Sequence, residues 1–281
     1  MPCRLASRRS LAAAACIVGG LLTAPPTAAG ASGAEAAVEA QPALKPLNLT
    51  GTLRDFTIDH PDMQFPEKSF GLRTGVVEPQ LDEDGKPVLA GSFGNPNRAM
   101  IHSAESFSQW FRDVPGVNRE VSHSITLEPV PFRPGYYRFA RELGMAEGFN
   151  QFFPLNGRGF NDLRTTKQGK NNYYFTYEID TVFTYTDPSE REHPLVFKFV
   201  GDDDVWVFIN GELVVDLGGV HSQLADEVNL DDPAVRKRLG LRVGQRYPLK
   251  LFFAERHTTQ SNFRIETSLA LQPSERGPLY D

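Results

Sequence analysis

The sequence predicts an all-β fold built mainly from antiparallel strands, with one or two short helices. Asn210-Gly211 lies between the apolar runs VWVFI and ELVVDL. Because both residues accept a positive φ, the pair is among the strongest short-range signals for a tight hairpin. Segments rich in β-branched and aromatic residues follow one another through the second half of the chain. The 281 residues suffice for one large β domain with a sizeable core.

Six strands are expected in the second half of the chain, because each segment is rich in β-branched or aromatic residues. They span residues 173–186, 195–200, 205–210, 212–217, 247–254 and 263–271. The alternation of apolar and polar residues that marks a half-buried strand is absent from VWVFI, and a lysine is the single polar residue in LVFKFV. The central strands are therefore expected to be buried on both faces, with Trp206 in the core.

A short amphipathic helix is expected at residues 103–114. Ser103 provides an N-cap, and Phe107, Trp110 and Phe111 follow at helical spacing. We expect these aromatic side chains to pack in the core rather than to form a platform for a ligand.

Two further segments have clear local signals. Asp232-Pro233 provides a cap and a first-turn proline for a second short helix, which is expected to end at Gly240. The acidic residues 82–84 precede Gly85 in a turn that resembles half of a calcium loop, but the later bidentate glutamate is missing. We interpret this acidic turn as solvated.

The first 31 residues are expected to form a signal peptide. Three arginines precede an apolar stretch at residues 11–22, which is too short to span a bilayer permanently, and cleavage is expected after Ala29 or Ala31. The pair Arg8-Arg9 also weakly suggests the twin-arginine route, although general secretion is favoured. The protein is therefore expected to be secreted, extracellular or part of the cell envelope, without membrane insertion.

Both cysteines, Cys3 and Cys16, lie in this leader, so the mature chain would have no disulfide, thiolate metal site or cysteine nucleophile. Residues 32–46 are expected to form a flexible Ala/Pro-rich spacer, followed by one domain at 47–273 and a tail at 274–281. Removing three arginines and no acidic residue changes the formal charge from −6 to −9. This charge disfavours nucleic acid and anionic membranes as partners.

Three consecutive aspartates, Asp202, Asp203 and Asp204, stand immediately before VWVFI. Adjacent carboxylates repel one another, so a compact fold keeps them together only where they are solvated or share a cation. Carboxylate and carbonyl oxygens without nearby cysteine are the ligands preferred by a hard cation such as calcium. The sequence therefore leaves two interpretations open, a calcium-dependent binding loop and a solvated acidic loop.

Three segments closely resemble the fibro-slime domain family: GDDDVWVFINGELVVDLGGVH at 201–221, FFAERHTTQSNFRIET at 252–267, and LTGTLRDF with HPDMQ within 49–64. That family looks like a relative of the protective-antigen superfamily of β-sandwich carbohydrate-binding modules. The resemblance implies a β-sandwich or barrel that binds a polysaccharide or glycan through calcium and has no catalytic activity. In those modules an Asp-Asp pair, often joined by a cis peptide bond, coordinates calcium, and the metal holds sugar hydroxyls.

The superfamily pattern places the aspartate pair eight residues before the first residue of the hairpin turn. Counting back from Asn210 then gives Asp202 and Asp203 as the implied calcium ligands. Asp204 falls where many relatives have glycine, so it could add a ligand or place a third charge beside the sugar site.

A second ligand loop of the superfamily lies between the last two strands, which corresponds here to residues 257–262. The resemblance implies Ser261 and Asn262 as further metal ligands, with main-chain carbonyls beside them. His257, Thr258 and Gln260 in the same loop are candidates for contacts with the ligand. His221, which follows a glycine pair, is a further candidate.

Three other interpretations remain open. His221 and His257 could form a zinc or catalytic site with the aspartates, although their separation lacks a local zinc-ligand spacing. Two of the acids Asp202, Asp203, Glu255 and Asp180 could serve a glycosidase, but adjacent aspartates cannot easily straddle a glycosidic bond. The protein could also be a structural component of an extracellular slime or matrix, in which calcium only braces loops.

Overall fold

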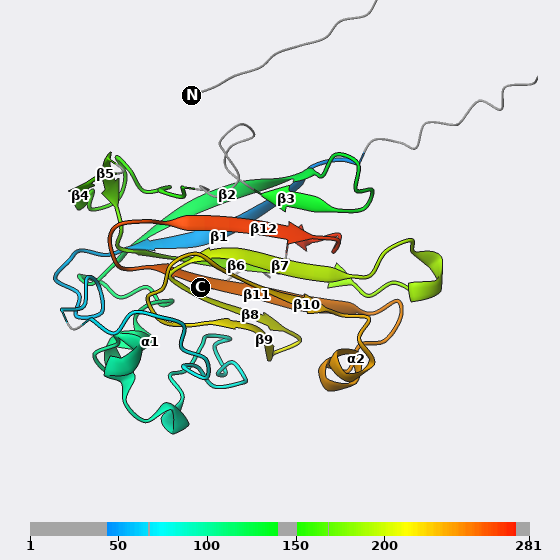
Figure 1. Cartoon of the computed structure of the whole chain (residues 1–281), viewed down its shortest axis with the longest axis horizontal. Coiled ribbons are helices and arrows are strands. Elements are labelled where there is room, and N and C mark those ends of the chain that lie inside the picture. Colours follow the sequence, from blue (N-terminus) through cyan, green and yellow to red (C-terminus); the bar gives the residue numbers. More distant parts are fainter. Residues whose placement is uncertain (1–43, 67, 140–150, 168, 274–281) are drawn as a thin grey trace, which may run out of the picture. The chain divides into compact units, whose positions relative to one another are not determined.

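Antiparallel strands form two sheets that pack face to face, which confirms the predicted all-β fold (Figure 1). The computed structural model describes residues 44–66, 68–139, 151–167 and 169–273. The expected signal peptide, most of the expected spacer and the expected C-terminal tail lie outside these residues.

The larger sheet has the strand order β2 (Arg119–Pro129), β1 (Leu47–Asp55), β6 (Phe175–Thr184), β11 (Arg246–Glu255), β8 (Asp204–Ile209) and β9 (Glu212–Leu217), and the short β13 (Gln272–Pro273) also pairs with β6. The smaller sheet has the order β10 (Leu224–Asn229), β7 (Val196–Asp202), β12 (Asn262–Thr267) and β3 (Tyr137–Phe139). β2 also pairs with β3, and β9 lies beside β10, so the sandwich is nearly closed.

The remaining elements are short. A separate hairpin comprises β4 (Leu163–Thr166) and β5 (Gly169–Asn172). The helices are α1 (Ala104–Ser108), α2 (Pro233–Leu239) and the 3-10 turns Gly91–Phe93, Pro96–Ala99 and Pro188–Glu190. α2 begins and ends as predicted, because Asp232 caps its first amides and Gly240 adopts a positive φ after its last residue. Within the described part of the chain, no helix has the length and apolar character needed to cross a membrane.

The predicted strands correspond to β6, β7, β8, β9, β11 and β12, with shifted ends. The strand β8 is buried along its whole length, as predicted. Val205, Val207 and Ile209 point between the two sheets, whereas Trp206 and Phe208 pack in a second core on the outer face. Sequence patterns did not indicate β1, β2 and β10, in which polar residues interrupt the apolar runs.

The hairpin between β8 and β9 turns at Asn210-Gly211, as predicted. Both residues have positive φ angles, 52° and 83°, which match the twist of two antiparallel strands joined by a two-residue turn. The hairpin thereby fixes the start of β8, and with it the aspartates, at the opposite end of the sheet from the turn.

The connection between β1 and β2, residues 56–118, covers the outer face of the larger sheet and creates the second core. Phe107 and Trp110 contact the Trp206 ring, with centroids 5.7 and 6.2 Å away, and Phe111 contacts Phe252 at 4.9 Å. These aromatic side chains are in the core, as predicted. The helix is shorter than predicted: α1 ends at Ser108, and the chain leaves the helix before Trp110 and Phe111 pack on the sheet.

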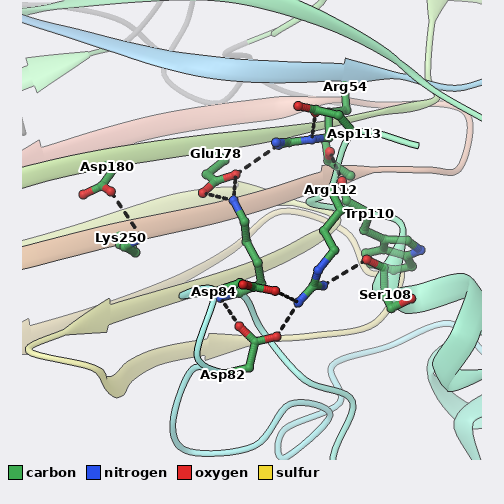
Figure 2. Close-up of polar contacts among 12 residues, drawn as sticks. Arg54, Asp82, Asp84, Ser108, Trp110, Arg112, Asp113, Glu178, Asp180 and Lys250 are labelled. Carbon is green, nitrogen blue, oxygen red and sulfur yellow. Dashed lines mark hydrogen bonds and ion pairs between the residues drawn. The ribbon is translucent and has the colours of Figure 1, made fainter. Parts of the chain in front are cut away.

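A polar network fastens the β1–β2 connection to the outer face of the larger sheet (Figure 2). Arg54 Nε lies 2.8 Å from Asp113 Oδ1, and Arg54 Nη1 lies 3.0 Å from Glu178 Oε2. Lys86 Nζ donates to both Glu178 oxygens at 2.6 Å. Asp82 in the acidic turn pairs with Arg112, so this turn is tied down at Asp82 rather than solvated throughout as expected.

Candidate functional site

Asp202 and Asp203 lie where the chain passes from the smaller sheet to the larger one, because β7 ends at Asp202 and β8 begins at the next residue but one. The peptide bond between them is cis, as the resemblance to calcium-binding modules implied. Both residues line a pocket of about 570 Å³, named here the aspartate pocket. Its lining residues are Phe70, Gly71, Leu72, Asp202, Asp203, Val220, His221, Ser222, Leu224, His257, Thr258, Thr259 and Gln260.

Asn262 is held against Asp202 by the strand register of β12 and β7. Its backbone N–H donates to Asp202 Oδ1 at 2.6 Å, and its side-chain Nδ2 donates to Asp202 Oδ2 at 2.7 Å. Since the amide nitrogen faces the carboxylate, Asn262 Oδ1 remains buried without a hydrogen-bond partner. Gly201 permits this approach, because a Cβ at that position would lie 2.2 Å from the Asn262 carbonyl oxygen.

The two aspartates are buried as well as adjacent. Burial raises the pKa of Asp202, although the hydrogen bonds from Asn262 favour its charged form. Burial also raises the pKa of Asp203 well above its ordinary value, opposed by the positive charge of Arg256 and reinforced by the neighbouring aspartates. Asp203 Oδ2 accepts a hydrogen bond from the Arg256 backbone N–H at 3.3 Å. The charged carboxylates therefore lack full compensation from protein groups alone.

Glu255, at the end of β11, is a third buried acid beside the pair. Burial raises the pKa of Glu255 well above its ordinary value, and the charges of Asp203 and Asp202 raise it further. The Ser261 hydroxyl and the His257 backbone N–H lie near enough to favour the charged form. Neither makes a hydrogen bond of ordinary geometry, so both Glu255 oxygens lack a partner. Sequence reasoning had offered Glu255 only as a glycosidase acid.

The Ser261 side chain serves the fold of the loop that precedes β12. Its hydroxyl donates to the Phe152 carbonyl at 2.8 Å, and its own carbonyl accepts the Phe152 N–H at 2.9 Å. The hydroxyl hydrogen is thus engaged, and only the oxygen lone pairs of Ser261 remain for a cation.

Asp204 does not lie where the sequence suggested. Its carboxylate points away from the aspartate pocket and into the second core, where Oδ2 pairs with Arg256 Nε at 2.6 Å and Oδ1 accepts the Gly219 N–H at 2.6 Å. Asp204 is therefore fully buried with both oxygens engaged, and it is not among the residues that line the aspartate pocket, where a sugar contact or extra ligand was expected. Asp204 begins β8 and shares the outer face of that strand with Trp206, whereas Asp203 lies between β7 and β8 and lines the pocket.

The histidines, Thr258 and Gln260 line the aspartate pocket, as expected for ligand contacts. His221 Nδ1 lies 3.0 Å from the Ser222 carbonyl oxygen, and His257 Nδ1 lies 2.6 Å from that of Thr258. Burial lowers the pKa of His257, which favours the neutral ring. Both rings are thus tied to loop backbone.

Gln64, from the HPDMQ segment, orders the loop that contains His257. Its Oε1 accepts the Thr258 N–H at 3.2 Å, and its Nε2 lies 2.9 Å from His257 Nε2. Two of the three segments that suggested the family resemblance therefore meet in the structure. Within residues 44–273, apart from the undescribed gaps, no three acid, histidine or cysteine side chains converge as a metal centre. A cation held by Asp202 and Asp203 would therefore need amide and main-chain oxygens as well.

The acids considered for a glycosidase do not form a facing pair across the pocket. Asp180 lies within β6, where Lys250 Nζ is 3.2 Å from its Oδ2, and it is not among the residues that line the aspartate pocket. Glu255 is fully buried and likewise does not line the pocket. The geometry thus supports a binding site better than a hydrolytic one.

Sequence reasoning missed one wall of the pocket, formed by Phe70, Gly71 and Leu72 in the β1–β2 connection. These residues have no strand or helix pattern. The signal available was an apolar pair around a glycine, with Phe70 and Leu72 left 51% and 42% exposed. Exposed apolar side chains beside a polar pocket indicate a contact surface.

Comparison with known proteins relates part of the chain to a described domain family. A family model described as the PA14 domain matches residues 159–278, which include both aspartates and the loop before β12. This part of the chain, which includes strands of both sheets, is thus similar to the PA14 domain.

Two relatives from Dictyostelium discoideum extend the similarity toward the N-terminus. Protein psiQ is 37% identical over 219 residues, covering 75% of this chain and 20% of psiQ. Protein psiR is 38% identical over 222 residues, covering 76% of this chain and 20% of psiR. The chain thus spans about a fifth of these relatives. Among solved structures, a PA14 sugar-binding domain from an RTX adhesin is 9% identical with a TM-score of 0.29, covering 80% of this chain and 94% of that one.

Proposed function

We propose that this protein is a non-catalytic module that binds carbohydrate through a calcium ion held at the Asp202-Asp203 pair. The observation that supports it best is the buried Asn262 Oδ1, which has no partner although it lies beside two buried carboxylates. A buried polar oxygen without a partner is rare, because leaving it unpaired costs about 1–3 kcal/mol. A cation would engage this oxygen and the carboxylates together.

The donor set fits calcium. Asp202 and Asp203 would supply the negative charge, Asn262 an amide oxygen, and the loop at residues 257–261 main-chain carbonyls, with the Ser261 hydroxyl oxygen as a further donor. All are hard oxygen ligands, and no cysteine is present after residue 16. Magnesium demands stricter octahedral geometry, so this flexible set of donors suits calcium better.

The residues around the ion would bind the sugar without catalysing a reaction on it. Bound calcium would supply coordination for adjacent sugar hydroxyls, and Thr258 and Gln260 offer hydrogen-bonding groups at the same pocket. His221 and His257 are anchored to loop carbonyls and would keep the loops in place. Such fixed polar groups position a ligand at little cost in conformational entropy.

The family branch, the export of the protein and the kind of partner belong to the same proposal. The motifs quoted above support the fibro-slime family as the branch of the PA14 superfamily to which the chain belongs. The arginine-led apolar leader supports export, with a role in adhesion or an extracellular matrix. The partner is accordingly a polysaccharide or glycan at the cell surface or outside the cell.

The test combines calcium titration by calorimetry with glycan-array binding in calcium and in chelator. Wild type should bind calcium and retain glycans only when calcium is present. Asp202→Asn should lose both, whereas Asp84→Asn is the matched control, because Asp84 is an exposed aspartate in the acidic turn outside the pocket. Calcium binding without any glycan would favour a matrix component whose loops calcium braces. Glycan cleavage would favour an enzyme, and no calcium binding would show that the buried aspartate pair does not hold the ion.

A further inference from the structure

The aspartate pocket is lined by both polar and apolar side chains, named here its polar wall and its apolar wall. Asp202, Asp203, Thr258, Thr259 and Gln260 form a polar wall from the ends of β7 and β11. Phe70, Leu72, Val220 and Leu224 form an apolar wall, in which Phe70 and Leu72 come from the β1–β2 connection. A ligand that fills this pocket therefore meets both polar groups and apolar side chains.

The segment that contains Phe70 is fixed in place by backbone pairing. Gly71 N–H donates to the Val220 carbonyl at 2.8 Å, and Arg73 N–H donates to the Gly218 carbonyl at 2.7 Å. Arg73 Nε also reaches the Arg98 carbonyl at 2.9 Å. These bonds flank Leu72 and hold the segment against the chain that leaves β9. The apolar wall is thus built into the fold.

The Phe70 ring is positioned but not buried. Its centroid lies 5.1 Å from that of His257, with the two rings perpendicular, so one contact with the β11–β12 loop orients it. About half of the residue, 51%, stays exposed at the pocket. An aromatic side chain that lines a pocket, is oriented by a neighbour and stays half exposed has a free surface for a ligand.

We propose that Phe70, with Leu72 beside it, is a specificity-determining contact that packs on the C–H face of a neutral pyranose. This inference rests on the proposed function and adds the class of sugar to it. Pyranose rings with several axial C–H groups on one face offer the apolar surface that Phe70 requires, while their hydroxyls face the polar wall.

The charges around the pocket favour a neutral sugar over a uronate or sulfated one. Among the described residues that line the pocket, none is a lysine or arginine. Arg256 is fully buried and pairs with Asp204, so its charge is already balanced by that carboxylate. Lys68 acts on His257 from nearby but does not line the pocket. One divalent cation would balance Asp202 and Asp203, which leaves no positive charge for an anionic ligand.

The experiment uses the full chain in saturating calcium, with methyl glycosides of glucose, galactose and mannose and with methyl glucuronide as the charged comparator. Wild type, Phe70→Ala and Phe70→Trp are compared by isothermal titration, and calcium binding is measured separately for each. Phe132→Ala is the matched control, because Phe132 is a fully exposed phenylalanine at the β2–β3 turn.

We expect Phe70→Ala to weaken binding of the preferred neutral glycoside about tenfold, which corresponds to about 1.4 kcal/mol and is typical of an aromatic contact. Calcium affinity should stay unchanged, Phe70→Trp should bind at least as well as wild type, and Phe132→Ala should behave as wild type. Equal sugar affinity of Phe70→Ala and wild type, loss of calcium binding in Phe70→Ala, or preference for the glucuronide would overturn the inference alone. If wild type binds calcium but none of these glycosides and no glycan on an array, the proposed function fails with it.

Discussion

Arg256 and Asp204 form a fully buried ion pair, with Arg256 Nε 2.6 Å from Asp204 Oδ2 and neither side chain accessible to solvent. Arg256 also donates to the carbonyls of Met100 and Ala99 at 2.6 Å each, and its guanidinium lies 5.0 Å from the Trp110 ring. One side chain therefore joins the start of β8, the end of β11 and the β1–β2 connection. The third aspartate of the run is thus part of a buried ion pair that links these segments.

Removing Asp204 should be strongly destabilising, because it leaves the Arg256 charge buried without its partner. We expect Asp204→Ala to lower the free energy of unfolding by about 3–5 kcal/mol, as measured by urea denaturation. Lys198→Ala provides a control, since Lys198 pairs with Glu227 at 3.1 Å on the surface and such pairs contribute less than about 1 kcal/mol. A loss in Asp204→Ala no larger than in the control would show that water or another group compensates Arg256.

Asp203→Asn should have opposite effects on stability with and without calcium. Burial raises the pKa of Asp203 well above its usual range, so without a cation its ionised form opposes folding, and stability falls as pH rises through the window above the ordinary carboxyl pKa. Replacing the charge by an amide removes this penalty. In chelator at pH 7.5, Asp203→Asn should melt at the same temperature as wild type or higher.

With calcium at about 100 times its dissociation constant, wild type should gain about 2.7 kcal/mol that Asp203→Asn lacks. Differential scanning calorimetry of both proteins in calcium and in chelator tests whether calcium reverses the order of their melting temperatures. Asp84→Asn should follow wild type in both buffers, because its side chain is exposed outside the pocket. If calcium leaves the wild-type melting temperature unchanged, the pair does not hold the ion.

We expect Asp231, which does not line the aspartate pocket, to make a pH-dependent contribution to stability. Burial favours the neutral form of Asp231, but both of its oxygens pair with Arg191 at 2.8 Å, and Tyr185 Oη donates to Oδ1 at 2.9 Å. Because these contacts favour the charged form, the pKa of Asp231 lies below the ordinary 3.8. A carboxyl group whose pKa is lower in the folded than in the unfolded protein stabilises the fold at pH values above its unfolded pKa. This stabilisation is lost as pH falls through the folded pKa.

Asp231→Asn should therefore lower the free energy of unfolding by about 1–3 kcal/mol at pH 7. The difference from wild type should shrink as pH falls below 3.8. Urea denaturation at pH 7, 4 and 3 gives the comparison, with Asp84→Asn as an exposed control. A difference that is the same at every pH would mean that the ion pair with Arg191 contributes nothing.

The sequence was sufficient for features that depend on neighbouring residues. Asn210-Gly211 fixes the hairpin by its own backbone preference, and the counted distance from that turn placed Asp202 and Asp203 at the pocket. The three aspartates are chemically alike, however, so only the strand geometry shows that Asp204 faces the opposite way.

The apolar wall could not be predicted in the same way. Phe70 reaches the pocket because its segment pairs with residues about 150 positions later, and no local pattern encodes that contact. Glu255 has the same difficulty, since its lack of a hydrogen-bond partner is a property of the packed fold. Long-range packing therefore decides which polar residues at the end of a strand line the pocket and which are buried away from it.

The glycine at 219 provides the last test, because it holds the Phe70 segment close to the pocket. Gly219 has a φ of 87°, and a Cβ there would lie 2.8 Å from the Gly71 carbonyl oxygen and 2.9 Å from Arg73 Cγ. Gly219→Ala should therefore displace the segment and weaken glycan binding, in addition to the strain of about 1–2 kcal/mol that a positive φ imposes on alanine. Gly116→Ala is the matched control, with a φ of 82° and open space at its Cβ position. It should show the strain alone in urea denaturation and bind glycan as wild type does. If the two variants lose the same stability and both keep full glycan affinity, the close contact between Gly219 and the Phe70 segment does not shape the site.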